Sequence, residues 1–102
     1  MIVITGTFDL KPEQREEAFG LFAEMAKASL AEEGCSAYAF FEDVALANHF
    51  RVYEEWADED AVAFHFATPH MTVFLEGLGQ IRPSNLDIEK IIVSSSGPLK
   101  NT

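Results

Sequence analysis

Apolar residues follow two different periods along this chain, and each change of period marks the border of an element. A β-branched run from Ile2 to Phe8 stops at Asp9-Leu10-Lys11-Pro12 and predicts a first strand. From Pro12 the period becomes helical, because proline suits the first helical turn and acidic residues follow it. The apolar face of this helix recurs over roughly 20 residues up to a stop at Gly34. Its members are Ala18, Leu21, Phe22, Met25, Ala26, Ser29 and Leu30.

Period-two alternation then returns twice, over residues 35–42 and 49–56, with a short connection that favours a hairpin. Asp58 is a candidate cap for a following helix. Thr68-Pro69 provides a second helix start, so two short helices bent relative to each other are expected. Residues 86–94 carry the last apolar run and predict a final strand.

This order, β-α-β-β-α-β, predicts the ferredoxin-like α+β fold, an antiparallel sheet with helices on one face. We expect one domain over residues 1–94 and a polar C-terminal tail over residues 95–102. The strands carry apolar residues on both faces, whereas the helices suffice to cover only one. A second copy of the chain would cover the other face, which predicts a homodimer built as a dimeric α/β barrel.

Composition and charge narrow the classes of partner. The chain of 102 residues has a formal net charge of −10, which disfavours nucleic acid and anionic membrane surfaces. Cys35 is the single cysteine, so an internal disulfide is not expected and a buried structural thiol is favoured. With no basic leader and no long apolar run, a cytoplasmic location without membrane attachment is the expectation.

The residues best suited to a chemical function lie in the region from the end of the third strand to the last helix. Trp56, His65 and His70 combine aromatic surface with proton transfer near neutral pH, which suits a pocket for a flat organic molecule. Structural roles compete with this interpretation. Trp56 suits a core or dimer-interface position, and His65 would fasten helix to strand through Glu54 or a backbone carbonyl. Glu54 itself suggests a buried pair, with His65 or with Arg51 of the partner subunit.

A metal site is not predicted from this pattern. His65 and His70 are five residues apart rather than four, and Pro69 interrupts the helix between them. We therefore expect the two imidazoles to point in different directions.

Several of these features together resemble a known family. They are the opening strand, the proline-started helix, the strand Asn48-His49-Phe50-Arg51-Val52-Tyr53-Glu54-Glu55-Trp56, and the positions Asp58, Ala61, His65, His70 and Phe74. Over residues 2–94 the chain resembles the antibiotic biosynthesis monooxygenase domain of the dimeric α/β-barrel superfamily, which includes quinol monooxygenases and autoinducer-processing enzymes.

The resemblance implies a cofactor-independent monooxygenase that oxidises a quinol or polyketide-like phenol with dioxygen. It assigns proton removal to His65 and His70, and contact with the small aromatic substrate to a second group of side chains. That group is Trp56, Asn48, Tyr38, Arg51, Phe64 and Phe74. Because the same scaffold hosts several chemistries, an isomerase or tautomerase and a non-catalytic small-molecule-binding dimer remain alternatives.

Overall fold

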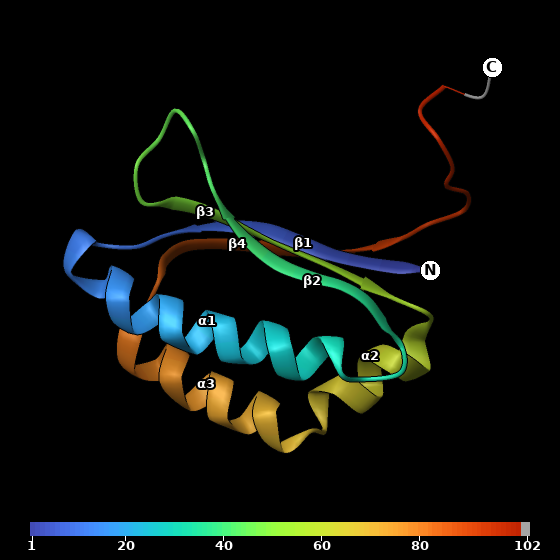
Figure 1. Ribbon diagram of the computed structural model, residues 1–102, viewed down its shortest axis with the longest axis horizontal. Coiled ribbons are helices and arrows are strands. Elements are labelled where there is room, and N and C mark those ends of the chain that lie inside the picture. The colour runs from blue at the N-terminus through green and yellow to red at the C-terminus, as the bar shows by residue number, and fades with distance from the viewer. Residues whose placement is uncertain (101–102) are drawn as a thin grey trace.

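The computed structural model describes residues 1–100, which form a four-stranded antiparallel sheet with its helices on one face (Figure 1). The elements are β1 (Ile2–Asp9), a 3-10 turn η1 (Pro12–Gln14), α1 (Arg15–Leu30), β2 (Cys35–Glu42), β3 (His49–Trp56), α2 (Glu59–Phe66), α3 (Pro69–Ile81) and β4 (Ser84–Ile92). The predicted ferredoxin-like order is confirmed. The last two residues of the predicted polar tail, 101–102, lie outside the described part.

The strands are arranged in the order β2-β3-β1-β4, so the N-terminal strand is central. In β1, Ile4 pairs with Glu54 of β3 on one side and with Lys90 of β4 on the other. Gly6 is required at its position, because a Cβ atom there would collide with the Asp87 carbonyl and the Ile88 backbone. The missing side chain lets β4 lie directly against β1.

Alternation along the strands separates two chemically different faces. Even-numbered residues of β1 and β3, such as Ile4, Val52 and Glu54, lie on the face covered by the helices and join the buried core. Odd-numbered residues, such as Thr5 and Arg51, lie on the opposite face, which no helix of residues 1–100 covers (Figure 1). The site must therefore be sought between the sheet and the helical layer.

Two element boundaries differ from the predicted ones. The first helix ends at Leu30 rather than near Gly34, because residues 31–34 turn back toward α2. Gly34 lies so close to Ala61 of α2 that a Cβ atom would sit 2.5 Å from the alanine methyl carbon. The last strand begins at Ser84, which pairs with Asp9, and ends at Ile92. Within the described chain, each helix is too short or too polar to cross a membrane.

Candidate active site

A cavity of about 180 Å³ lies between the helical layer and the sheet. Three of its lining residues are polar: Tyr38, Glu54 and His65. The others are apolar: Ile4, Phe8, Phe22, Phe40, Val52, Phe66, Met71, Phe74, Leu75, Leu78, Pro83, Leu86 and Ile88. An apolar cavity of about 150 Å³ is large enough to bind benzene. The cavity therefore has room for one aromatic ring and a few polar groups to orient it.

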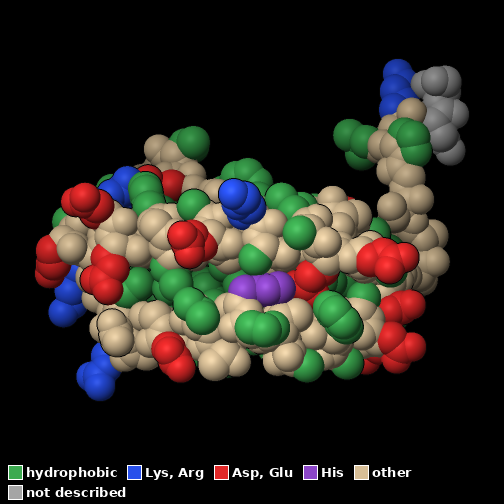
Figure 2. All heavy atoms as spheres, turned by 60° about the horizontal axis from the view of Figure 1, so that its bottom comes forward, with side chains coloured by type: hydrophobic (Ala, Val, Ile, Leu, Met, Phe, Trp, Pro, Cys, Tyr) green, Lys and Arg blue, Asp and Glu red, His purple; other side chains and the backbone are tan. Residues whose placement is uncertain are grey.

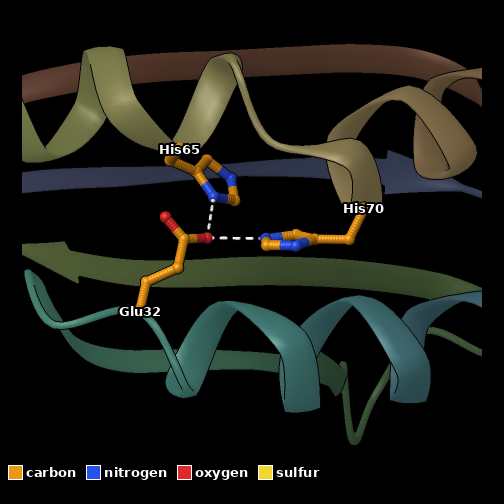
Figure 3. A group of neighbouring side chains, drawn as sticks. All are labelled: Glu32, His65 and His70. Carbon is orange, nitrogen blue, oxygen red and sulfur yellow. Dashed lines mark hydrogen bonds and ion pairs between the residues drawn. The ribbon is translucent and has the colours of Figure 1, made fainter.

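One carboxylate oxygen holds two imidazoles beside this cavity (Figure 3). Glu32 Oε2 lies 2.7 Å from His65 Nδ1 and 2.6 Å from His70 Nε2. The side chains of Glu32 and His65 are only 6% and 2% exposed, whereas that of His70 is 27% exposed. Figure 2 shows imidazole surface among hydrophobic side chains on the helical side of the molecule. The trio thus reaches from the buried cavity wall to solvent.

The junction of α2 and α3 brings the two imidazoles together. Asp58 caps α2 by accepting a hydrogen bond from the Ala61 amide, as the sequence predicts. Thr68 Oγ1 donates to the His65 carbonyl oxygen at 2.7 Å and accepts from the Met71 amide, which ties the end of α2 to the start of α3. The chain bends here and the imidazole centroids lie 5.8 Å apart. The expectation that the two rings point in different directions is wrong, because it assumes spacing along one straight helix.

His65 has the geometry of a general base. Burial lowers the pKa of the imidazole, while the hydrogen bond to Glu32 opposes that shift. The ring is therefore neutral near pH 7, and with Nδ1–H donated to the carboxylate its lone pair lies on Nε2. Within residues 1–100, Nε2 makes no hydrogen bond. A neutral imidazole with a free acceptor nitrogen thus forms part of the cavity wall.

Glu54 is the second titratable group on the cavity wall. Burial raises its pKa to about 7, and a hydrogen bond from Trp56 Nε1 to Glu54 Oε1, 2.9 Å long, opposes part of that rise. Burial also raises the pKa of Tyr38 well above its usual range, so this phenol stays a neutral donor. The Trp56 indole is fully buried, and its ring centroid lies 4.3 Å from that of His65. The contact with Trp56 restricts the orientation of the His65 ring.

The structure gathers most of the sequence-predicted site residues around the cavity. His65, Tyr38 and Phe74 line it, and Trp56 packs directly behind His65. His70 shares the carboxylate of Glu32 with His65.

Three other predicted contact residues lie elsewhere. Asn48 is in the β2–β3 connection, where its side-chain oxygen accepts a hydrogen bond from Arg15. Arg51 is on the open face of the sheet and donates to Thr5 Oγ1. Phe64 is 65% exposed on α2 and is not among the lining residues. Strand alternation directs Arg51 away from the cavity. The position of Phe64 around the axis of α2 directs its ring away as well.

Sequence reasoning missed Glu32 as a functional residue. The buried positions of α1 are Ala18, Phe22, Met25 and Ser29, and the same alternation of four and three residues continues to Glu32. A carboxylate at the next position of a buried stripe is the signal that could have found it. Cys35 is only half-buried, and burial raises the pKa of its thiol to about 11.

Fold and site together define a small α+β protein with a ring-sized apolar cavity between sheet and helices and a histidine–carboxylate group beside it. The sequence profile described as "Antibiotic biosynthesis monooxygenase" matches residues 1–77. The chain belongs to that family.

Individual relatives agree with this membership. "Putative monooxygenase YcnE" of Bacillus subtilis is 35% identical over 94 residues, which is 92% of this chain and 99% of that protein. An uncharacterized Synechocystis protein is 34% identical over 92 residues, and the match spans 88% of this chain but 63% of that protein. An isomerase of (4S)-4-hydroxy-5-phosphonooxypentane-2,3-dione from Escherichia coli is 38% identical over 55 residues, 54% of this chain and 57% of that protein.

Solved structures show the same fold. A crystal structure from Deinococcus radiodurans, described as a "putative antibiotic biosynthesis monooxygenase", superposes with a TM-score of 0.89 at 25% identity and covers 99% of this chain and 100% of its own. A structure from Mycobacterium tuberculosis superposes with a TM-score of 0.84 at 18% identity, covering 95% of this chain and 98% of its own.

Proposed function

We propose that the protein is a cofactor-independent monooxygenase that oxidises a single-ring or small fused-ring quinol, or a polyketide-like phenol, with dioxygen. One observation carries the proposal. His65 lines an apolar cavity, the buried Glu32 holds its Nδ1, and within residues 1–100 its Nε2 makes no hydrogen bond. Family membership and the monooxygenase named among the relatives agree with it.

In the proposed reaction, His65 removes the phenolic proton through Nε2, and Glu32 stabilises the imidazolium that forms. The substrate anion then transfers electrons to dioxygen. For a hydroquinone, one oxygen atom replaces a ring hydrogen and the other leaves as water, so the products are a hydroxyquinone and water. The substrate supplies all the electrons. Tyr38 would donate a hydrogen bond to the developing anion, and the apolar lining would exclude water.

The partly exposed ring of His70 provides a path by which the proton taken up by His65 can reach solvent. The His65 side chain is only 2% exposed, which limits direct proton exchange with bulk water. Glu32 connects it to His70, whose side chain is 27% exposed. We propose that His70 takes part in the reaction through this connection rather than by touching the substrate.

An isomerase is the second candidate, and the matching E. coli isomerase favours it. Moving a proton between two carbon atoms requires the same base in the same kind of cavity, but no oxygen. Oxygen consumption therefore separates the two reactions.

Oxygen uptake with a panel of benzo- and naphthohydroquinones tests the proposed function. We expect substrate loss in air, one dioxygen consumed per substrate, and a hydroxyquinone product, with no substrate loss under argon. The rate should persist after dialysis against a chelator. Equal conversion of the panel with and without oxygen would indicate isomerisation instead, and no conversion of any substrate in air would contradict the proposal.

We also propose that a second copy of the chain covers the open face of the sheet. This face carries Ala37, Ala39 and the 56%-exposed Phe41 on the edge strand β2. Sheet faces with such apolar residues are covered in stable domains.

Sedimentation velocity should accordingly show a species of twice the 11.3 kDa chain mass. The substitution Ala39→Arg places a charge in the open face and should shift the equilibrium to monomer. Ala63→Arg, on the exposed side of α2, is the matched control and should leave the dimer intact. A wild-type chain that sediments as a monomer would contradict the pairing.

A further inference from the structure

We propose that Glu32, His65 and His70 form a binding site for a divalent transition-metal ion of the Zn²⁺ type. The candidate ligand atoms are His65 Nδ1, His70 Nε2 and a carboxylate oxygen of Glu32, and all lie within 4.8 Å of one another (Figure 3). This binding does not depend on the oxygenation proposed above.

A second, independent feature points to a ligand at this place. Glu32 Oε1 is buried and has no hydrogen-bond partner in the described chain, although the Glu32 side chain is only 6% exposed. Buried carboxylate oxygens normally have partners, because leaving one without a partner is costly. A cation beside the carboxylate would relieve this cost, since the carboxylate can bind it through one or both oxygens.

The donor set selects the class of metal. Two imidazoles and one carboxylate are the protein ligands of His₂Glu zinc sites and of non-haem iron sites, both of which keep open positions for water or another ligand. Mg²⁺ and Ca²⁺ prefer oxygen ligands throughout, so this site should discriminate against them. The net charge of −10 adds a general attraction for cations.

Only a small movement separates the present arrangement from a coordinated one. Donors about 2.1 Å from a tetrahedral Zn²⁺ stand roughly 3.4 Å apart, whereas the two nitrogen–oxygen distances here are 2.6 and 2.7 Å. His70 lies in the first turn of α3 with its ring partly exposed, so it can move outward and offers an entry path. The contact between the buried Glu32 and His65, now 2.7 Å, would also have to lengthen by about 0.7 Å.

Coordination would change the chemistry of the cavity wall. A neutral imidazole bound through Nδ1 carries its proton on Nε2, and in His65 that nitrogen is the proposed base. Metal binding should therefore inhibit the proposed oxygenation. This consequence rests on the proposed function, whereas the binding itself does not.

Titration of Co²⁺ into the full chain at about pH 8 tests the site through the visible absorption bands of the bound ion. We expect one Co²⁺ per chain, displaced by Zn²⁺ but not by Mg²⁺. Glu32→Gln and His70→Gln should each weaken binding by more than about 100-fold, because even outer-shell changes cost about 10–100-fold. His49→Gln is the matched control, since His49 Nδ1 pairs with Asp9 at 2.5 Å without a second imidazole.

Three outcomes would overturn the proposal: no Co²⁺ bands with wild-type protein at millimolar metal, wild-type affinity in the Glu32→Gln and His70→Gln variants, or an equal loss in His49→Gln. Circular dichroism shows whether each variant is folded. If Glu32→Gln does not fold, His70→Gln decides the question, because its partly exposed ring can be removed without opening the core.

Discussion

Substitution of His65 by glutamine is expected to lower kcat for hydroquinone-dependent oxygen uptake by about 10²–10⁴-fold, the usual contribution of a positioned general base. Glutamine keeps a polar side chain of similar length but has no nitrogen that can accept the substrate proton at neutral pH. The cavity lining is otherwise unchanged, so KM should change much less than kcat. Steady-state rates at an oxygen electrode measure both quantities.

The control for this experiment is His49→Gln, which removes an imidazole paired with a carboxylate on the open side of the sheet. It should retain the wild-type rate. A folded His65→Gln protein with wild-type kcat would show that the base lies elsewhere and would remove the main support for the proposed mechanism.

Substitution of Glu54 by glutamine is expected to remove a pH dependence of stability that the wild-type protein shows between about pH 4.5 and 7. The folded-state pKa of Glu54 is raised to about 7 from an ordinary value of 4.5, so the folded state holds this proton more tightly than the unfolded state. Its contribution to stability is complete below about pH 4.5 and is lost as pH rises through 7. The loss amounts to about 3 kcal/mol.

Urea unfolding at the two ends of this pH range, followed by the fluorescence of the single tryptophan, measures the effect. Relative to wild type, Glu54→Gln should gain stability as the pH rises, because the amide remains neutral. Glu55→Gln, on the open face of the sheet next to Tyr53, is the control and should keep the wild-type pH dependence. Equally steep pH dependence in Glu54→Gln and wild type would contradict the assignment.

The fold could be predicted because each local signal agrees with the final architecture. Pro12 starts the first helical region, Asp58 and Thr68 cap the next two helices, and the alternating runs become paired strands. Gly34 misled the prediction of the first helix end. Its role is close packing against α2, and the residues before it form the turn that carries Glu32.

The site could be predicted only in part, because it depends on elements that approach each other in three dimensions. His65 and His70 stand out as titratable groups, but their common partner comes from the turn after α1, more than thirty residues away. Arg51, in contrast, could have been excluded from the cavity on the sequence alone. The strand alternation already places it on the face opposite Glu54, so that pattern alone argues against a place in the cavity.

The proposed mechanism requires that Glu32 hold His65 as a neutral ring whose Nε2 is free to accept a proton. Long-range proton–nitrogen NMR of the chelator-dialysed protein at neutral pH reports the tautomer directly, with His65→Gln providing the assignment. We expect a protonated Nδ1 and an unprotonated Nε2. A ring protonated on Nε2, or on both nitrogens, would contradict it.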